Sequence, residues 1–161
     1  MTDLQIGTKA PDFNLSLGGE PQTLTGLEGR PVVVFFYPRA GTPGCTNEVT
    51  EFSKRYGEFA AIGVEVVGIS PDAPAKLARF RDKHGLHVHL ASDEGLEIAK
   101  AWGVWVEKQM YGRRYMGVER ATFLVDSKGT IAALWRKVKV AGHVEEVLAT
   151  ARALGGARGD A

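Results

Sequence analysis

Apolar positions along this chain of 161 residues predict several strands that are buried on both faces. The runs Pro31 to Phe36 and Val64 to Ile69 are dominated by β-branched and aromatic residues, which is typical of central strands. Two similar runs, Ala121 to Val125 and Ile131 to Trp135, flank the turn sequence Asp126 to Gly129. This arrangement predicts an antiparallel hairpin in the second half of the chain.

Helical spacing of apolar residues appears between and after these strands. Leu77, Phe80 and His84 recur about one turn apart, and Gly85 then provides a helix stop. The sequence therefore predicts four helices, over residues Thr46 to Tyr56, Ala75 to His84, Leu96 to Trp102 and Val144 to Leu154.

Shorter extended segments complete the pattern. Phe13 to Leu15 and Gln22 to Thr25 lie on either side of the predicted turn Gly18-Gly19, and His87 to Ala91 is a further short strand candidate. Strand–helix alternation followed by a hairpin and a helix predicts an α/β sandwich with a mixed central sheet flanked by helices. We expect a single domain over residues 1–154 and a disordered tail over residues 155–161.

Composition narrows the function classes. Apolar residues make up 44% and charged residues 24% of the chain, and the net charge is +1. This balance gives no reason to expect a nucleic-acid or membrane partner. No apolar run is long enough to cross a bilayer, and the first residues show no signal peptide, so we expect a cytoplasmic protein.

A single cysteine, Cys45, excludes an internal disulfide framework and a cysteine-cluster zinc site. It lies in the Pro/Gly-rich segment Pro38 to Glu48, which joins a predicted buried strand to a predicted helix. A thiol in the first turn of a helix meets unpaired backbone N–H groups and the positive end of the helix dipole. Both favour the thiolate, so the sequence predicts a reactive sulfur rather than an inert buried one.

A helix terminus supplies only part of the stabilisation that a thiolate needs at neutral pH, so a nearby cation is expected. Candidates are Arg39 in the same loop, which we interpret as a solvated residue, and Arg120, just before a predicted strand. A thiolate beside an arginine suits attack on a peroxide O–O bond, because hydrogen-bond donors stabilise the charge on the leaving oxygen. The Thr42 hydroxyl, the backbone N–H groups of Gly44 and Cys45, and the Arg120 guanidinium are the expected donors.

The segment Pro38 to Glu48 resembles the active-site signature of peroxiredoxins, Pro-x-x-x-Thr-x-x-Cys, in the form found in the bacterioferritin-comigratory-protein or peroxiredoxin Q branch. The resemblance extends to Ala10 to Phe13, Val66 to Ser70 and Tyr115 to Asp126, and so covers nearly the whole chain. It implies a thioredoxin fold of the peroxiredoxin type, with no cofactor and no metal.

The resemblance also implies roles for individual residues. Cys45 is the peroxidatic cysteine that becomes a sulfenic acid, while Thr42 and Arg120 hold and polarise the peroxide. Pro38 shields the pocket, and Glu48 orients Arg120 through a charge-assisted hydrogen bond. The implied activity is reduction of hydrogen peroxide and organic hydroperoxides.

One position departs from the family pattern. Many members of this branch carry a second, resolving cysteine five residues after the first, where this chain has Thr50. We therefore expect a one-cysteine cycle that is completed by an external thiol, such as thioredoxin, glutaredoxin or a small thiol like glutathione. We also expect over-oxidation to sulfinic acid at high peroxide, and a monomer or weak homodimer.

The same residues bear on several other functions. A disulfide oxidoreductase needs a Cys-x-x-Cys pair, but Glu48 occupies the second position. A cysteine hydrolase would need a histidine base, from His143 or the cluster at 84–89. His87 and His89 could share a strand face as a metal pair, but surface or half-buried histidines are favoured. A peroxide sensor or holdase switched by Cys45 oxidation remains the alternative.

Overall fold

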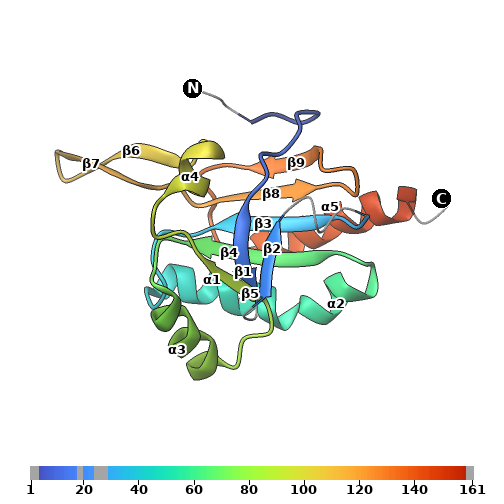
Figure 1. Cartoon of the computed structure of the whole chain (residues 1–161), viewed down its shortest axis with the longest axis horizontal. Coiled ribbons are helices and arrows are strands. Elements are labelled where there is room, and N and C mark those ends of the chain that lie inside the picture. Colours follow the sequence, from blue (N-terminus) through green and yellow to red (C-terminus); the bar gives the residue numbers. More distant parts are fainter. Residues whose placement is uncertain (1–3, 18–19, 24–28, 159–161) are drawn as a thin grey trace.

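The structure is a computed structural model that describes residues 4–17, 20–23 and 29–158 (Figure 1). Its centre is a mixed five-stranded sheet in the order β5-β4-β3-β8-β9, in which β3, β4 and β5 are parallel and β8 and β9 are antiparallel to their neighbours. The strands of this sheet are β3 (Val32–Phe36), β4 (Glu65–Ser70), β5 (His89–Ser92), β8 (Ala121–Val125) and β9 (Ile131–Trp135). The predicted central strands and the predicted hairpin are thus confirmed.

Each face of the sheet carries its own apolar core. One core gathers Phe35, Val66 and Leu124 from the strands with side chains of the helices α1, α2, α3 and α5. The opposite core gathers Phe36 and Ile69 with the N-terminal segment and α4. The helices are α1 (Pro43–Lys54), α2 (Tyr56–Ala61), α3 (Pro74–His84), α4 (Glu97–Ala101) and α5 (His143–Arg158).

Two antiparallel hairpins lie outside the central sheet. The first joins β1 (Asn14–Leu17) to β2 (Glu20–Thr23). Its predicted turn, Gly18-Gly19, and the predicted strand end, Thr25, lie outside the described residues. The second hairpin joins β6 (Trp105–Met110) to β7 (Arg113–Val118) and extends away from the body of the molecule (Figure 1).

Several element boundaries differ from the sequence prediction. The predicted helix Thr46 to Tyr56 corresponds to α1, which begins earlier, at Pro43, and ends at Lys54, because the backbone at Arg55 leaves helical geometry (φ −97°, ψ 4°). The short helix α2, which starts at Tyr56, was not predicted. The strand predicted from His87 begins at His89, since the His87 backbone N–H donates to the Ser53 hydroxyl at 2.8 Å. The last helix continues past Leu154 to Arg158, so part of the expected tail is helical.

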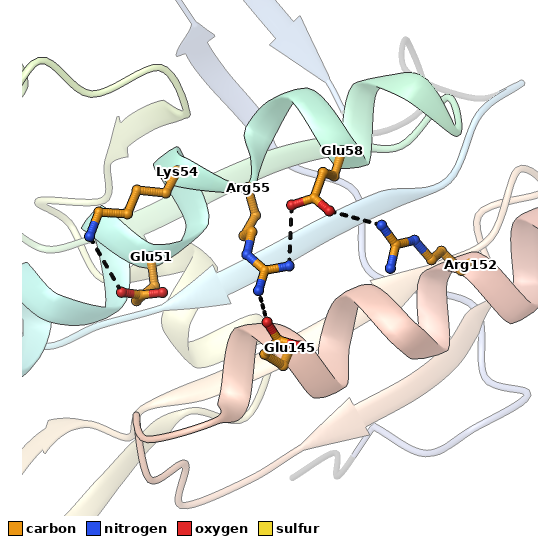
Figure 2. A network of polar contacts seen from close by, with 6 residues as sticks. All are labelled: Glu51, Lys54, Arg55, Glu58, Glu145 and Arg152. Carbon is orange, nitrogen blue, oxygen red and sulfur yellow. Dashed lines mark hydrogen bonds and ion pairs between the residues drawn. The ribbon is translucent and has the colours of Figure 1, made fainter.

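A network of ion pairs fastens the α1–α2 corner to α5 (Figure 2). Arg55 binds Glu58 at 3.2 Å and also pairs with Glu145 of α5, while Arg152 of α5 binds Glu58 at 2.9 Å. The helix that carries Cys45 is therefore tied at its far end to the last helix. Across the described residues, no helix is both long and apolar enough to cross a membrane.

Candidate active site

Cys45 lies in the first turn of α1, which begins at Pro43 directly after the loop that leaves β3. Thr42 is the N-cap residue, and its carbonyl accepts the first helical hydrogen bond, from the Thr46 N–H at 2.8 Å. Helix geometry consequently leaves the N–H groups of Gly44 and Cys45 without partners inside the helix. The sulfur thus lies at the positive end of the helix dipole, as the sequence predicts.

Sheet register brings Arg120 to the cysteine although 75 positions separate them in the sequence. Phe36, the last residue of β3, lies opposite Ala121, the first residue of β8. Arg120 therefore lies beside the start of the cysteine loop, and its carbonyl accepts a hydrogen bond from the Val138 N–H at 3.0 Å. From this position Nη2 donates to the Cys45 Sγ at 3.3 Å.

Gly44 makes this approach possible. A Cβ at position 44 would lie 3.3 Å from Nη2 of Arg120, which is tighter than ordinary van der Waals contact. The Pro-Gly sequence before the cysteine thus starts the helix with a rigid residue and leaves space for the guanidinium above the helix terminus.

Glu48 holds the other side of the guanidinium. Its Oε1 accepts a hydrogen bond from Nη1 of Arg120 at 2.7 Å, as the family resemblance implies. Burial raises the pKa of Glu48 to about 7, although Arg120 acts in the opposite direction. Burial also disfavours the charged guanidinium, but Glu48 and Cys45 outweigh it and raise the pKa of Arg120, which therefore stays a cation.

Thr42 and Pro38 lie in the loop over the site, but the Thr42 hydroxyl is not oriented as a free donor. It donates its hydrogen to the Arg39 carbonyl at 2.9 Å, so its oxygen is left to accept a hydrogen bond from a bound molecule. Arg39 is exposed and makes no contact with the sulfur, in agreement with the interpretation of a solvated loop residue.

Access to the sulfur is restricted, because Cys45 is 0% exposed. A groove of about 700 Å³ is lined by the cysteine loop and by the β6–β7 hairpin. Pro38 and Thr42 line it from the cysteine loop, and Tyr115 and Met116 line it from β7.

Sequence reasoning missed Lys108, which lines the same groove. Burial and the charge of Arg120 lower the pKa of Lys108, while Cys45 and Glu119 act in the opposite direction. Lys108 belongs to the polar run Glu107 to Gln109 on a hairpin, and nothing in that run distinguishes it from a solvated side chain. Only the pairing of β6 with β7 reveals its direction.

The histidines do not form the sites considered from the sequence. His143 is buried and its Nε2 lies 2.8 Å from the Thr122 hydroxyl, not beside the thiol. Burial lowers the pKa of His143 to about 4. His87 lies outside the strand and is exposed, and His89 pairs with Glu65 at 3.1 Å. An exposed His87 and a half-buried His89 agree with the favoured interpretation of surface or half-buried histidines. The described residues contain no group of three or more His, Cys, Asp or Glu side chains that could hold a metal ion.

Comparison with known proteins agrees with this site. Residues 6–134 match the model of the AhpC/TSA family. The chain belongs to this family. Peroxiredoxin Bcp of Bacillus subtilis is 42% identical over 148 residues, which cover 91% of this chain and 94% of that protein. Peroxiredoxin Bcp of Escherichia coli is 40% identical over 149 residues, 92% of this chain and 96% of the relative.

Solved structures give the same result for the fold. The bacterioferritin comigratory protein of Xanthomonas campestris superposes with a TM-score of 0.87 at 38% identity, over 94% of this chain and 99% of that chain. A peroxiredoxin Q of Xylella fastidiosa superposes with a TM-score of 0.88 at 35% identity, over 95% and 98% of the two chains. The predicted thioredoxin-type peroxiredoxin fold is confirmed. The single cysteine of the sequence, Cys45, is consistent with a peroxiredoxin that lacks a resolving cysteine.

Proposed function

We infer that this peroxiredoxin is a thiol-dependent peroxidase that reduces hydrogen peroxide and organic hydroperoxides to water or alcohol. The observation that carries the proposal is the position of Cys45 Sγ, at a helix N-terminus and 3.3 Å from a guanidinium that a buried carboxylate holds in place. Both features favour a thiolate, and a thiolate needs no general base to attack a peroxide.

The surrounding groups suit the charge that develops during attack. As the S–O bond forms and the O–O bond breaks, negative charge moves to the leaving oxygen, which donors in the site can stabilise. We assign this role to Arg120 and to the N–H groups of Gly44 and Cys45. The Thr42 oxygen accepts a hydrogen bond from the peroxide and so orients the substrate. Pro38 shields the site.

The sulfenic acid on Cys45 is then reduced by a thiol from outside the chain, because the sequence contains no other cysteine. Thioredoxin, glutaredoxin or a small thiol such as glutathione are the reductants that fit. A cycle of this kind requires a reducing compartment, so we place the protein in the cytoplasm as an antioxidant enzyme. We expect it to act as a monomer or a weak homodimer.

Peroxide consumption with a continuous thiol supply tests the proposal. We expect the wild-type protein to turn over many times with at least one of these reductants and Cys45→Ser to be inactive. A single round of oxidation without turnover would instead favour the sensor or holdase function. Activity in Cys45→Ser would overturn the assignment of the nucleophile.

Arg120→Lys tests the observation that carries the proposal. The guanidinium donates to Glu48 through Nη1 and to the sulfur through Nη2, whereas a lysine ammonium has one nitrogen and cannot reproduce this two-pronged geometry. We expect the rate constant for sulfenic acid formation to fall about 10²-fold or more, in line with the loss of one oriented donor. Stopped-flow fluorescence measures this step, and an unchanged rate constant would contradict the role of Arg120.

A further inference from the structure

The peroxidase reaction leaves one proton unaccounted for. When Cys45 attacks a hydroperoxide, the nearer oxygen keeps its hydrogen in the sulfenic acid, and the farther oxygen leaves as an alkoxide or hydroxide. That oxygen needs a proton, and a strongly basic leaving group departs faster when a positioned acid supplies one.

The groups in contact with the sulfur are poor proton donors. Arg120 is held as a cation by Glu48 and Cys45 and does not release its proton. The Thr42 hydroxyl donates to the Arg39 carbonyl. Glu48 is 0% exposed, and its Oε1 faces Arg120. Glu48 is also sealed from the groove by its burial, so a cation that faces the groove is better placed to give a proton to the leaving oxygen.

Lys108 is directed toward that point by the hairpin. It lies opposite Tyr115 in the β6–β7 ladder, but its stem runs back over Gly117. A Cβ at position 117 would lie 3.2 Å from Cδ and 3.4 Å from Cε of Lys108. Because Gly117 is two residues farther along β7 than Tyr115, the ammonium points toward the base of the hairpin, where Arg120 follows.

The surroundings of Lys108 suit proton donation. Pro38 and Thr42 share the groove with it, and in the described part of the chain it forms no ion pair. The charged or titratable groups around it are Arg120, Cys45 and Glu119 from the body of the molecule, and Tyr115 and Arg39 in the groove wall. Burial and Arg120 lower the pKa of Lys108, which makes its ammonium a better acid than a solvated one.

We propose that Lys108 is the proton donor to the leaving oxygen of the peroxide, through the groove that the β6–β7 hairpin forms beside Cys45. A sulfur lone pair forms the S–O bond, the O–O bond breaks, and its electron pair goes to the leaving oxygen, which takes a proton from Nζ. The sulfur is oxidised to the sulfenic acid and the peroxide is reduced to water or alcohol. The neutral amine then regains a proton from water. This proposal rests on the proposed peroxidase function.

Peroxides with different leaving groups test the proposal. Hydrogen peroxide leaves as hydroxide and needs a proton, whereas peracetic acid leaves as acetate and does not. We expect Lys108→Met to lower the rate constant of Cys45 oxidation by hydrogen peroxide about 10²-fold, with little change for peracetic acid. Single-turnover stopped-flow fluorescence isolates this step from reductant, and Trp105 in the groove wall is a local reporter.

Four further variants separate proton donation by Lys108 from other effects on the reaction. Lys108→Arg keeps the charge but donates a proton poorly, so we expect it to retain the defect with hydrogen peroxide. Gly117→Ala should give a milder defect of the same kind, because the added Cβ displaces the Lys108 stem. Tyr115→Phe, which removes another groove hydroxyl, and Lys100→Met, which removes an exposed cation on α4, should react like the wild type.

The possible outcomes are distinct. Equal losses with both peroxides in Lys108→Met, no loss with either, or full recovery in Lys108→Arg would each overturn proton donation by Lys108. A defect in Tyr115→Phe as large as that of Lys108→Met would move the role to the phenol. If the wild-type protein does not form a sulfenic acid with any peroxide, the proposed peroxidase function itself fails.

Discussion

At the scale of single residues, the site depends on a carboxyl group placed where water cannot reach it. Glu48 offers one oxygen to Arg120, while its Oε2 has no hydrogen-bond partner among the described residues. The arrangement orients the guanidinium on the sulfur but makes the charge on Glu48 costly. The sequence marks Glu48 only through its place in the family motif, and burial adds the energetic consequence.

The cost of burying a charged Glu48 should appear as a pH-dependent difference in the free energy of unfolding between the wild type and Glu48→Gln. Because burial raises the pKa of Glu48 from 4.5 to about 7, the folded state binds its proton more tightly than the unfolded state between these values. Its contribution to the free energy of unfolding is therefore greatest below pH 4.5 and falls as pH rises toward 7, by at most about 1.4 kcal/mol per pH unit.

Urea denaturation of both proteins at pH 5 and pH 8 measures the effect. We expect the stability of the wild type relative to Glu48→Gln to be lower at pH 8 than at pH 5. His143, whose pKa is lowered to about 4, acts in the opposite direction below pH 6.5, but it is present in both proteins and cancels. A difference that does not change with pH would contradict the inference.

At the scale of elements, α1 is fixed at both ends. Its first turn carries Cys45 under Arg120, and its last residues adjoin the ion-pair network with α5 (Figure 2). Arg55 is the centre of that network, since it pairs with Glu58 and Glu145 and also separates α1 from α2. The ion-pair network thus holds α1 at its C-terminal end, while Cys45 lies in its first turn.

Arg55→Ala should lower the free energy of unfolding by about 1 kcal/mol, and high salt should reduce the effect, because these pairs are partly exposed. Lys54→Ala is the matched control. Its pair with Glu51 is a single i,i+3 contact at 3.8 Å with a lysine side chain that is 68% exposed. Urea denaturation at low and high salt measures both variants, and equal effects would argue against a network.

At the scale of the whole molecule, the lone cysteine determines how the catalytic cycle ends. No second thiol in the chain can trap the sulfenic acid as an internal disulfide. Without such a trap, the sulfenic acid persists until an external thiol or a second peroxide molecule reacts with it.

Excess peroxide without thiol should therefore convert Cys45 to the sulfinic acid, with two added oxygen atoms visible by intact-mass spectrometry. A thiol reductant present from the start should suppress this product, and Cys45→Ser should not form it. If the wild-type protein remained reduced or appeared only as disulfide-linked forms, the one-cysteine cycle would be wrong.

The sequence alone determined the features that depend on interactions between residues close together in the chain. An apolar, β-branched run such as Val32–Phe36 favours a buried strand whichever strand lies beside it. The Pro-Gly sequence before Cys45 favours a helix start through backbone constraints within a few residues. The motif around Cys45 therefore predicted a reactive thiol, and a resemblance over nearly the whole chain predicted the family. The break at Arg55 and the late start of β5 at His89 were not predictable, because contacts with other segments decide them.

Only the tertiary structure decided which distant groups meet the sulfur. The register of β3 against β8 places Arg120 at the thiol, and the register of β6 against β7 turns Lys108 over Gly117 toward the same point. Burial of Cys45 and Glu48 likewise depends on packing between layers of the fold. These features are non-local because a strand's sequence specifies its own pleat but not the partner or offset that brings a remote side chain to the site.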